Sequence, residues 1–140
     1  MHNVYLSLGS NIGNRKRLIR TAIDMIDQKV GHVIKQSGLY ETEPWGFYSP
    51  NMFINACVCC ETKLSPRGVL LITQGIEKTL GRTGKSVDGN YSDRVIDIDI
   101  LLYDDLRVDE PDLKIPHPLM HERDFVMNPL KEICGAEMNL

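Results

Sequence analysis

The sequence predicts an α+β fold of the ferredoxin-like type, in which an antiparallel sheet has its helices packed on one face. Two patterns favour this fold class. Four apolar stretches have the alternation and composition of strands, and two longer stretches repeat apolar residues at helical spacing. Their order along the chain, β-α-β-β-α-β, is the order of ferredoxin-like folds. Because the opposite face of such a sheet is free of these two helices, we expect a functional site there.

The first half of the chain supplies a strand, a helix and two further strands. Residues 4–8 form a short apolar strand that ends at a cluster of turn-forming residues. After Asn14, apolar side chains recur at three- and four-residue spacing as far as Gly31, which predicts an amphipathic helix. Residues 32–40 and 52–62 are the next two strands.

The second half repeats the pattern of a helix followed by a strand. Ser65 as N-cap and Pro66 at the first helical position begin the helix, and Gly81 ends it. A polar loop over residues 82–93 then leads to a strand over residues 94–103. The remainder contains loops rich in proline and a short helix over residues 125–134.

Composition places the chain among ordinary globular proteins and excludes some functions. With 140 residues, 42% apolar and 25% charged, we expect one domain spanning residues 1–140. A net charge of −3 argues against a dedicated nucleic-acid binder. The sequence contains no long apolar run and no signal-peptide pattern, so we expect a cytoplasmic protein without membrane contact. Nothing indicates an obligate protein partner.

Four cysteines need a separate explanation. Cys57, Cys59 and Cys60 lie in one apolar run, and Cys134 stands apart. Adjacent strand residues point to opposite faces, so Cys59 and Cys60 cannot easily bind one metal ion. We interpret these cysteines as small apolar residues of a core.

Asp97 and Asp99 are the most informative pair in the chain. In a strand they share one face, while Ile96, Ile98 and Ile100 fill the other. Two carboxylates among aliphatic residues usually need a cation, and hard divalent metals prefer oxygen ligands. From the pair alone, the alternative of two solvated aspartates that each pair with an arginine stays open.

Residues 41–50 form a loop, because two prolines and a glycine exclude regular structure there. Together with Phe53 and Asn55, this loop indicates a pocket for a flat ligand. The loop offers backbone groups, Phe53 offers a ring and Asn55 offers an amide. The alternative is that Phe53 belongs to the core and that Asn55 is satisfied locally. An asparagine in the middle of a strand is disfavoured without a partner, which favours the pocket.

Two further segments carry cations. Residues 81–86 resemble the end of a P-loop, but Thr79 replaces its first glycine and a helix precedes it, so a true P-loop is excluded. Prolines flank His117, and Arg123 could bind a phosphate through two hydrogen bonds. A rigid surface turn with solvated charges is the alternative for this second segment.

Two motifs are specific enough to indicate a family: Arg94-x-x-Asp97-x-Asp99, and Pro116-His117-Pro118 followed by Arg123-x-Phe125. In this order and spacing they resemble the 6-hydroxymethyl-dihydropterin pyrophosphokinases. That resemblance extends to about Ile133. It implies transfer of a pyrophosphoryl group from ATP to the pterin hydroxymethyl, with two Mg²⁺ ions.

The resemblance also implies a role for each matching residue. Asp97 and Asp99 would bind the metal ions, and with Arg82 and Arg94 they would form the catalytic set. The pterin would contact Thr42, Pro44, Trp45, Gly46, Phe53, Asn55 and Phe125. ATP would contact Gln74, Glu77, Arg82, Arg94, Ile98, His117 and Arg123.

The chain also departs from this family. Residues 90–94 read Asn-Tyr-Ser-Asp-Arg where Arg-Trp-Gly-Pro-Arg is common, Gly84 replaces a frequent arginine, and Trp45 replaces a more usual leucine. We therefore expect the loop over residues 82–93 to close with fewer cations. We also expect it to be mobile without ligand and to order over the triphosphate through Arg82.

Two other functional classes remain open. A non-catalytic ligand-sensing domain of the same fold would not need two strand aspartates facing several arginines. A nucleotidyl or glycosyl transferase with an Asp-x-Asp pair would normally need a larger nucleotide-binding domain. Measuring nucleotide binding with and without Mg²⁺ would separate the sensor from the enzymes, because a sensor needs no metal ion.

Overall fold

The computed structural model describes residues 1–81 and 95–134 and confirms the predicted fold class. Its main sheet is antiparallel, with the strand order β2-β4-β1-β5, and β3 pairs with β4 as well. The strands of this sheet are β1 (His2–Ser10), β2 (Gly31–Gln36), β3 (Tyr40–Thr42), β4 (Phe53–Thr62) and β5 (Asp97–Tyr103). The first and last strands of the motif, β1 and β5, are therefore neighbours, as a ferredoxin-like topology requires.

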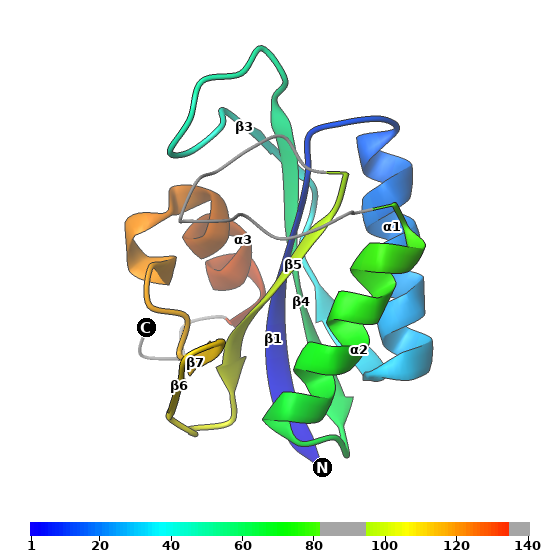
Figure 1. Ribbon diagram of the computed structural model, residues 1–140, viewed down its shortest axis with the longest axis vertical. Helices are drawn as coiled ribbons and strands as arrows, with labels where there is room; N and C mark the ends of the chain where they lie inside the picture. Colours follow the sequence, from blue (N-terminus) through cyan, green and yellow to red (C-terminus); the bar gives the residue numbers. More distant parts are fainter. Residues whose placement is uncertain (82–94, 135–140) are drawn as a thin grey trace.

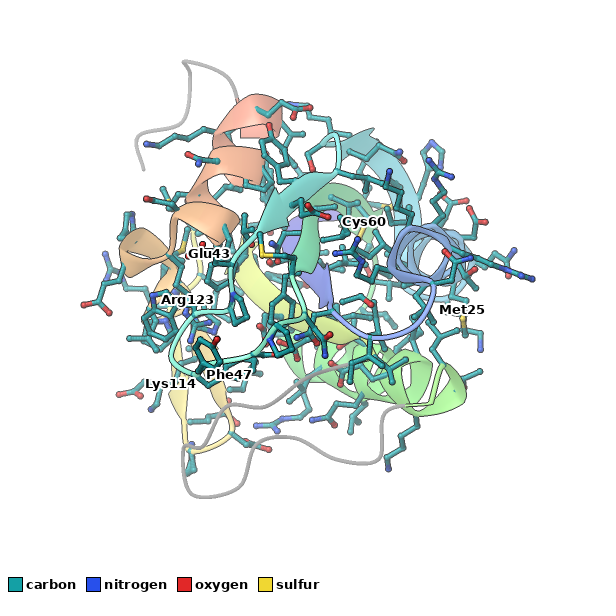
Figure 2. The ribbon with its side chains drawn as sticks, turned by 90° about the horizontal axis from the view of Figure 1, so that it is seen from above. Met25, Glu43, Phe47, Cys60, Lys114 and Arg123 are labelled. Carbon is teal, nitrogen blue, oxygen red and sulfur yellow. The ribbon has the colours of Figure 1, made fainter. Side chains whose placement is uncertain are left out.

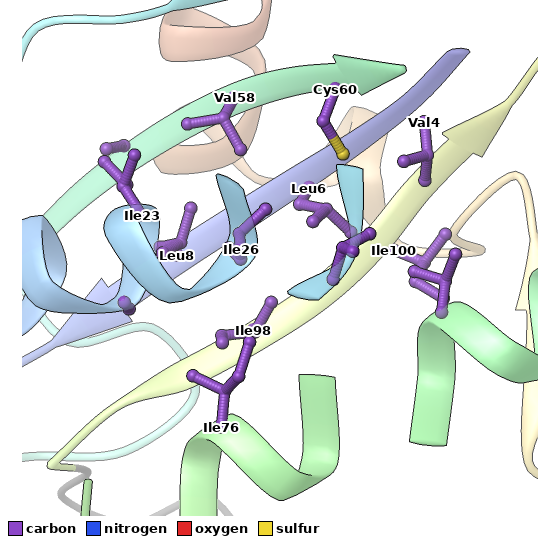
Figure 3. Close-up of a cluster of buried hydrophobic side chains, with 14 of the residues drawn as sticks. Val4, Leu6, Leu8, Ile23, Ile26, Val58, Cys60, Ile76, Ile98 and Ile100 are labelled. Carbon is purple, nitrogen blue, oxygen red and sulfur yellow. The ribbon is translucent and has the colours of Figure 1, made fainter. Parts of the chain in front are cut away.

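Helices α1 (Arg15–Lys29) and α2 (Pro66–Thr79) cover one face of the sheet (Figure 1). Each begins at an N-cap, because Asn14 accepts a hydrogen bond from the backbone of Arg17 and Ser65, the predicted cap, accepts one from Gly68. Between helices and sheet lies the main core (Figure 3). It includes Val4, Leu6, Leu8, Ile23, Ile26, Val58, Cys60, Ile76, Ile98 and Ile100.

A third helix, α3 (Asp124–Cys134), packs on the other side of the sheet (Figure 1). With the short 3-10 helix η1 (Met120–Glu122), it covers Tyr5, Cys57, Cys59 and Leu101. This second cluster occupies only the part of the face under α3. The site described below therefore occupies another part of the same face.

The cysteines follow the prediction. All four are buried free thiols, with Cys60 in the main core and Cys57, Cys59 and Cys134 in the cluster under α3. Burial raises the pKa of Cys57, and it raises the pKa of Cys60 to about 12. They behave as small apolar residues.

Several strand boundaries and one hairpin differ from the sequence-based expectation. The strand expected over residues 32–40 ends at Gln36, and Tyr40–Thr42 is a separate strand that extends two residues into the expected loop. Ser37 and Gly38 explain this interruption: the Ser37 hydroxyl donates to the Gly38 carbonyl, and the Gly38 amide donates to Glu132 of α3. A side chain of the distant helix α3 therefore accepts the backbone hydrogen bond that a neighbouring strand would otherwise accept.

The hairpin of β6 (Val108–Glu110) and β7 (Leu113–Ile115) was expected to be loop. Its strands have three residues each, too few for an alternating pattern to be recognised in the sequence. Burial of Leu113 and Ile115 in the main core stabilises it, and so does Arg67, which binds both Glu110 and Asp112.

Among the described residues, none of the helices combines the length and the hydropathy that a membrane span requires.

Candidate active site

Three residues form a row across the end of the sheet: Asn55 on β4, Gly9 on β1 and Asp97 on β5. Gly9 pairs with Asn55 on one side and with Asp97 on the other. Directly opposed residues of antiparallel strands share a face, so the Asn55 and Asp97 side chains lie on the same face of the sheet with Gly9 between them. This is the face opposite α1 and α2.

Gly9 keeps the centre of this row open. A Cβ atom placed on it would lie 3.1 Å from the Asn55 side-chain oxygen and 3.6 Å from the Phe53 ring. The sequence placed Gly9 in a turn at the end of the first strand, but β1 continues to Ser10 and Gly9 lies inside it. A glycine inside a strand is nevertheless a recognised signal for close approach of a ligand or another group, and it could have been used.

Asn55 is held in a defined orientation. Its side chain is only 2% exposed, and its amide nitrogen donates to the hydroxyl of Thr42 at 2.6 Å. Thr42 lies on β3, which pairs with the start of β4, so the short strand missed in the sequence analysis positions this contact. A fixed amide with one donor engaged suits recognition of the polar edge of a flat ligand.

Two aromatic residues of the β3–β4 loop pack against rings on two different elements. Phe47 of the β3–β4 loop meets Phe53 edge to face, with ring centroids 6.2 Å apart. Trp45 of the same loop lies 6.5 Å from Phe125 on α3. Gly46 between them has a φ of +84°, which favours glycine and turns the two neighbouring aromatic residues toward different partners.

The aspartates occupy the start of β5 as predicted. Asp97 and Asp99 are partly exposed, whereas Ile96, Ile98 and Ile100 are buried. The alternation expected from the sequence is thus confirmed. Two carboxylates on one face supply oxygen ligands of the kind that Mg²⁺ takes together with water and phosphate oxygens.

Within the described ranges, 1–81 and 95–134, no cluster of three or more His, Cys, Asp or Glu side chains could hold a metal ion.

Glu77 of α2 lies beside the two aspartates, and its side chain points toward the backbone of β5. Glu77 as a whole is 3% exposed, and its carboxylate accepts a hydrogen bond of 2.8 Å from the backbone amide of Ile98. The Ile98 side chain belongs to the main core, so any contact that it makes with a nucleotide would come from its backbone. Gln74 is partly exposed one helical turn before Glu77.

The segment before α3 supplies His117 and Arg123. The Nδ1 atom of His117 accepts from the Leu119 amide at 3.3 Å, so in the neutral ring Nε2 carries the proton and can donate. Arg123 is 8% exposed, and its guanidinium lies over the Trp45 ring. The segment that carries Arg123 and the aromatic loop are therefore in direct contact.

Arg15 of α1 contacts both ends of the aromatic loop between β3 and β4. Its guanidinium donates to the Met52 carbonyl at 2.8 Å and to Glu41 at 3.0 Å. Asn11 donates to the Asn51 carbonyl beside it. These contacts border an open hollow of about 410 Å³ and tie both ends of the loop to the body of the protein.

Arg82 and Arg94, the other predicted phosphate ligands, lie outside the described residues, and so does the loop expected to close over the triphosphate. Of the predicted pterin residues, Asn55 contacts Thr42 and Trp45 packs against Phe125. Phe53 contacts Phe47 of the β3–β4 loop. Pro44 and Gly46 belong to the same loop.

The fold and this site together define a class: a ferredoxin-like α+β protein in which a buried amide and a pair of carboxylates share one face of the sheet. Comparison with known proteins gives the family. Residues 5–135 match the family model of 7,8-dihydro-6-hydroxymethylpterin-pyrophosphokinase. The chain belongs to this family, and it is therefore an ATP-dependent diphosphotransferase.

Relatives cover most of the chain. A 2-amino-4-hydroxy-6-hydroxymethyldihydropteridine pyrophosphokinase of Porphyromonas gingivalis is 52% identical over 94% of this chain and 90% of its own length. The enzyme of the same name from Bacillus subtilis is 41% identical over 96% of this chain and 80% of its own length.

Solved structures support the fold. A crystal structure of HPPK-DHPS in complex with substrates has a TM-score of 0.77 at 14% identity, covering 94% of this chain and 40% of that one. Wild-type Plasmodium falciparum HPPK-DHPS with pteroate has a TM-score of 0.75 at 17% identity, with 94% and 38% coverage. The chain thus spans about two fifths of these longer proteins, and at such identities the likeness concerns the fold alone.

Proposed function

We propose that this chain transfers pyrophosphate from ATP to the hydroxymethyl group of 6-hydroxymethyl-7,8-dihydropterin and releases AMP, as a step of folate synthesis. The row of Asn55, Gly9 and Asp97 is the observation that carries the proposal. It sets an amide suited to a pterin edge about 10 Å, two strand spacings, from a carboxylate suited to a metal-bound phosphate. That separation fits two substrates that react end to end.

The proposed reaction is a displacement at phosphorus. The hydroxymethyl oxygen forms a bond to the β-phosphorus of ATP, and the bond from that phosphorus to the oxygen bridging to the α-phosphate breaks. The bridging oxygen leaves with AMP, and the hydroxyl proton passes to water. Positioning and charge neutralisation supply most of the catalysis in such transfers, so the proposed reaction does not require a general base.

For the pterin, we propose that Asn55 reads the polar edge while Phe53 and Phe125 stack on the ring. Thr42 holds the Asn55 amide in place, since the two side chains are hydrogen bonded. Backbone groups of the loop residues Pro44, Trp45 and Gly46 complete the contacts, by resemblance to the family.

On the nucleotide side, Asp97 and Asp99 would hold two Mg²⁺ ions. When bound, such ions neutralise phosphate charge and favour ionisation of the attacking hydroxyl. Arg123 would bind phosphate oxygens, and His117 would donate a hydrogen bond from Nε2. We propose that ATP also contacts Gln74, Glu77, Ile98, Arg82 and Arg94.

We further propose that residues 1–140 act as one catalytic domain in the cytoplasm and that the substrates are small molecules only. ATP as co-substrate and four free thiols agree with a reducing compartment.

The test is a product assay. The protein is mixed with ATP, hydroxymethyl-dihydropterin and Mg²⁺, and the nucleotide products are separated. We expect AMP in equal amount to the pterin product, and no AMP when the metal is chelated. Formation of ADP would contradict pyrophosphoryl transfer, because it would mean transfer of the γ-phosphate alone.

Calorimetry separates the remaining alternatives. We expect a non-hydrolysable ATP analogue to bind in the presence of Mg²⁺ and to bind much more weakly without it. Equal binding in both conditions, together with an absence of AMP, would favour a ligand-sensing domain over an enzyme.

A further inference from the structure

The single tryptophan of the chain lies on an arginine. The guanidinium carbon of Arg123 is 4.5 Å from the centroid of the Trp45 ring and 5.8 Å from the centroid of the Phe125 ring. The two rings are 6.5 Å apart and tilted by 59°. The cation is thus flanked by two aromatic rings that come from different parts of the chain.

The backbone of Arg123 is fixed independently of this contact. Its amide donates to the Met120 carbonyl, and its carbonyl accepts from the amides of Val126 and Met127 at the start of α3. The guanidinium, however, lies at the end of a long flexible side chain. Rings packed against its face determine how the plane is oriented, and the plane determines where its N–H groups point.

Phe47 provides a contrast within the same loop. It packs on Phe53 of β4, whereas Trp45 packs toward Arg123 and α3. Figure 2, seen from above, shows Glu43, Phe47 and Arg123 toward the same side of the molecule, around the β3–β4 loop. Two aromatic residues of one loop therefore contact two different sides of the site.

We propose that Trp45 is a positioning residue that holds the Arg123 guanidinium in the orientation in which it receives the triphosphate. This inference rests on the proposed function, because it assigns Arg123 to the nucleotide. It also makes the β3–β4 loop, whose other residues surround the pterin pocket, part of the phosphate site. Pterin binding and phosphate orientation are thus linked through one side chain.

Steady-state kinetics test the role of the ring. Trp45→Leu removes the aromatic face, and we expect kcat to fall by about tenfold to a hundredfold from misplacement of Arg123, with a higher KM for ATP. Trp45→Phe keeps a ring over the cation and should recover most of this loss. Phe47→Leu is the matched control in the same loop, and it should raise the KM for the pterin with little change in the KM for ATP.

Fluorescence provides a readout that does not depend on turnover. Because Trp45 is the only tryptophan, all tryptophan emission of the protein comes from it. We expect Arg123→Met and Arg123→Lys to change the emission of the free protein. A non-hydrolysable ATP analogue with Mg²⁺ should change the emission of the wild type and of Phe47→Leu, but not that of Arg123→Met.

Two results would overturn the inference. One is an emission spectrum that is the same with and without the Arg123 side chain. The other is a Trp45→Leu enzyme whose kcat and KM for ATP match those of Phe47→Leu. If the wild type forms no AMP at all, the proposed function fails instead, while the emission of the Arg123 variants still decides whether Trp45 reports on this cation.

Discussion

The carboxylate of Glu77 accepts a hydrogen bond of 2.8 Å from the backbone amide of Ile98, the residue between Asp97 and Asp99. Strand β5 lies at the edge of the sheet path, so its outward amides need partners from other elements. Glu77 of α2 supplies one at the position that separates the two aspartates. It is therefore placed to fix the strand geometry on which the proposed metal site depends.

We expect Glu77→Ala to lower kcat and to raise the Mg²⁺ concentration needed for half-maximal activity. It should also destabilise the fold by about 1–3 kcal/mol, because a buried amide loses its acceptor. Glu77→Gln keeps an acceptor oxygen and should lose less. The measurements are Mg²⁺ titrations of activity and denaturant unfolding, with the exposed Lys78→Ala on the same helix as control. An unchanged Mg²⁺ requirement in Glu77→Ala would contradict this role.

Asp97→Ala and Asp99→Ala should each abolish turnover and leave the fold intact. Each removes an anionic oxygen ligand, and each relieves repulsion between two like charges on one strand face. AMP release and thermal unfolding are the measurements. The exposed Asp105→Ala, just beyond β5, is the control and should remain active. Near-normal turnover in either Asp97→Ala or Asp99→Ala would exclude the two-metal proposal.

The sequence was sufficient to predict the faces of the site strands. Residues at positions 96, 98 and 100 are aliphatic, so the strand could bury only one face, and the aspartates had to occupy the other. Helix starts were predictable for a similar local reason, since Asn14 and Ser65 cap the backbone within a few residues.

Features that depend on distant partners were not predictable in this way. Strand β3 is separated from β2 because Glu132 of α3 binds the Gly38 amide and the Tyr40 hydroxyl. The stack of Trp45 on Arg123 joins residues that are far apart in the chain. No local pattern encodes such contacts, and they determine how the loop around the proposed pterin pocket is held.

Phe125→Ala should weaken pterin binding by about 1–3 kcal/mol through lost stacking and apolar contact, with little change in ATP affinity. Its ring lies on α3 next to Trp45, at the border of the pocket. Calorimetric titration of each ligand into wild type and variant is the measurement. Equal losses for both ligands would mean that Phe125 has a structural role and that the pocket is misplaced.

The buried thiols should be unreactive in the folded protein. Burial, with the charges of Cys59 and Asp27, raises the pKa of Cys60 from 9.0 to about 12, and burial also raises the pKa values of Cys57, Cys59 and Cys134. At pH 8 we expect slow modification by a thiol reagent in buffer and rapid modification in urea.

The same shifts predict a pH dependence of stability. Above about pH 9 the unfolded chain loses thiol protons that the folded chain keeps, so the free energy of unfolding should fall as pH rises toward 12. Denaturant unfolding across this range measures the effect, and Cys60→Ala should reduce the slope. In the thiol-reagent experiment, rapid modification of all four thiols in the folded state would contradict their assignment to the core.

Gly9→Ala should impair pterin binding and leave nucleotide binding nearly unchanged. The added methyl would lie 3.1 Å from the Asn55 side-chain oxygen, so the amide must move by a few tenths of an ångström and disturb its 2.6 Å hydrogen bond with Thr42. Overpacking of this kind costs about 1–3 kcal/mol. Gly75→Ala is the control, because no atom lies within 4 Å of its added Cβ, and in a helix alanine is favoured over glycine. The measurements are separate titrations with the pterin and with a non-hydrolysable ATP analogue. An unchanged pterin affinity in Gly9→Ala would show that the row from Asn55 to Asp97 does not form the floor of the pterin pocket.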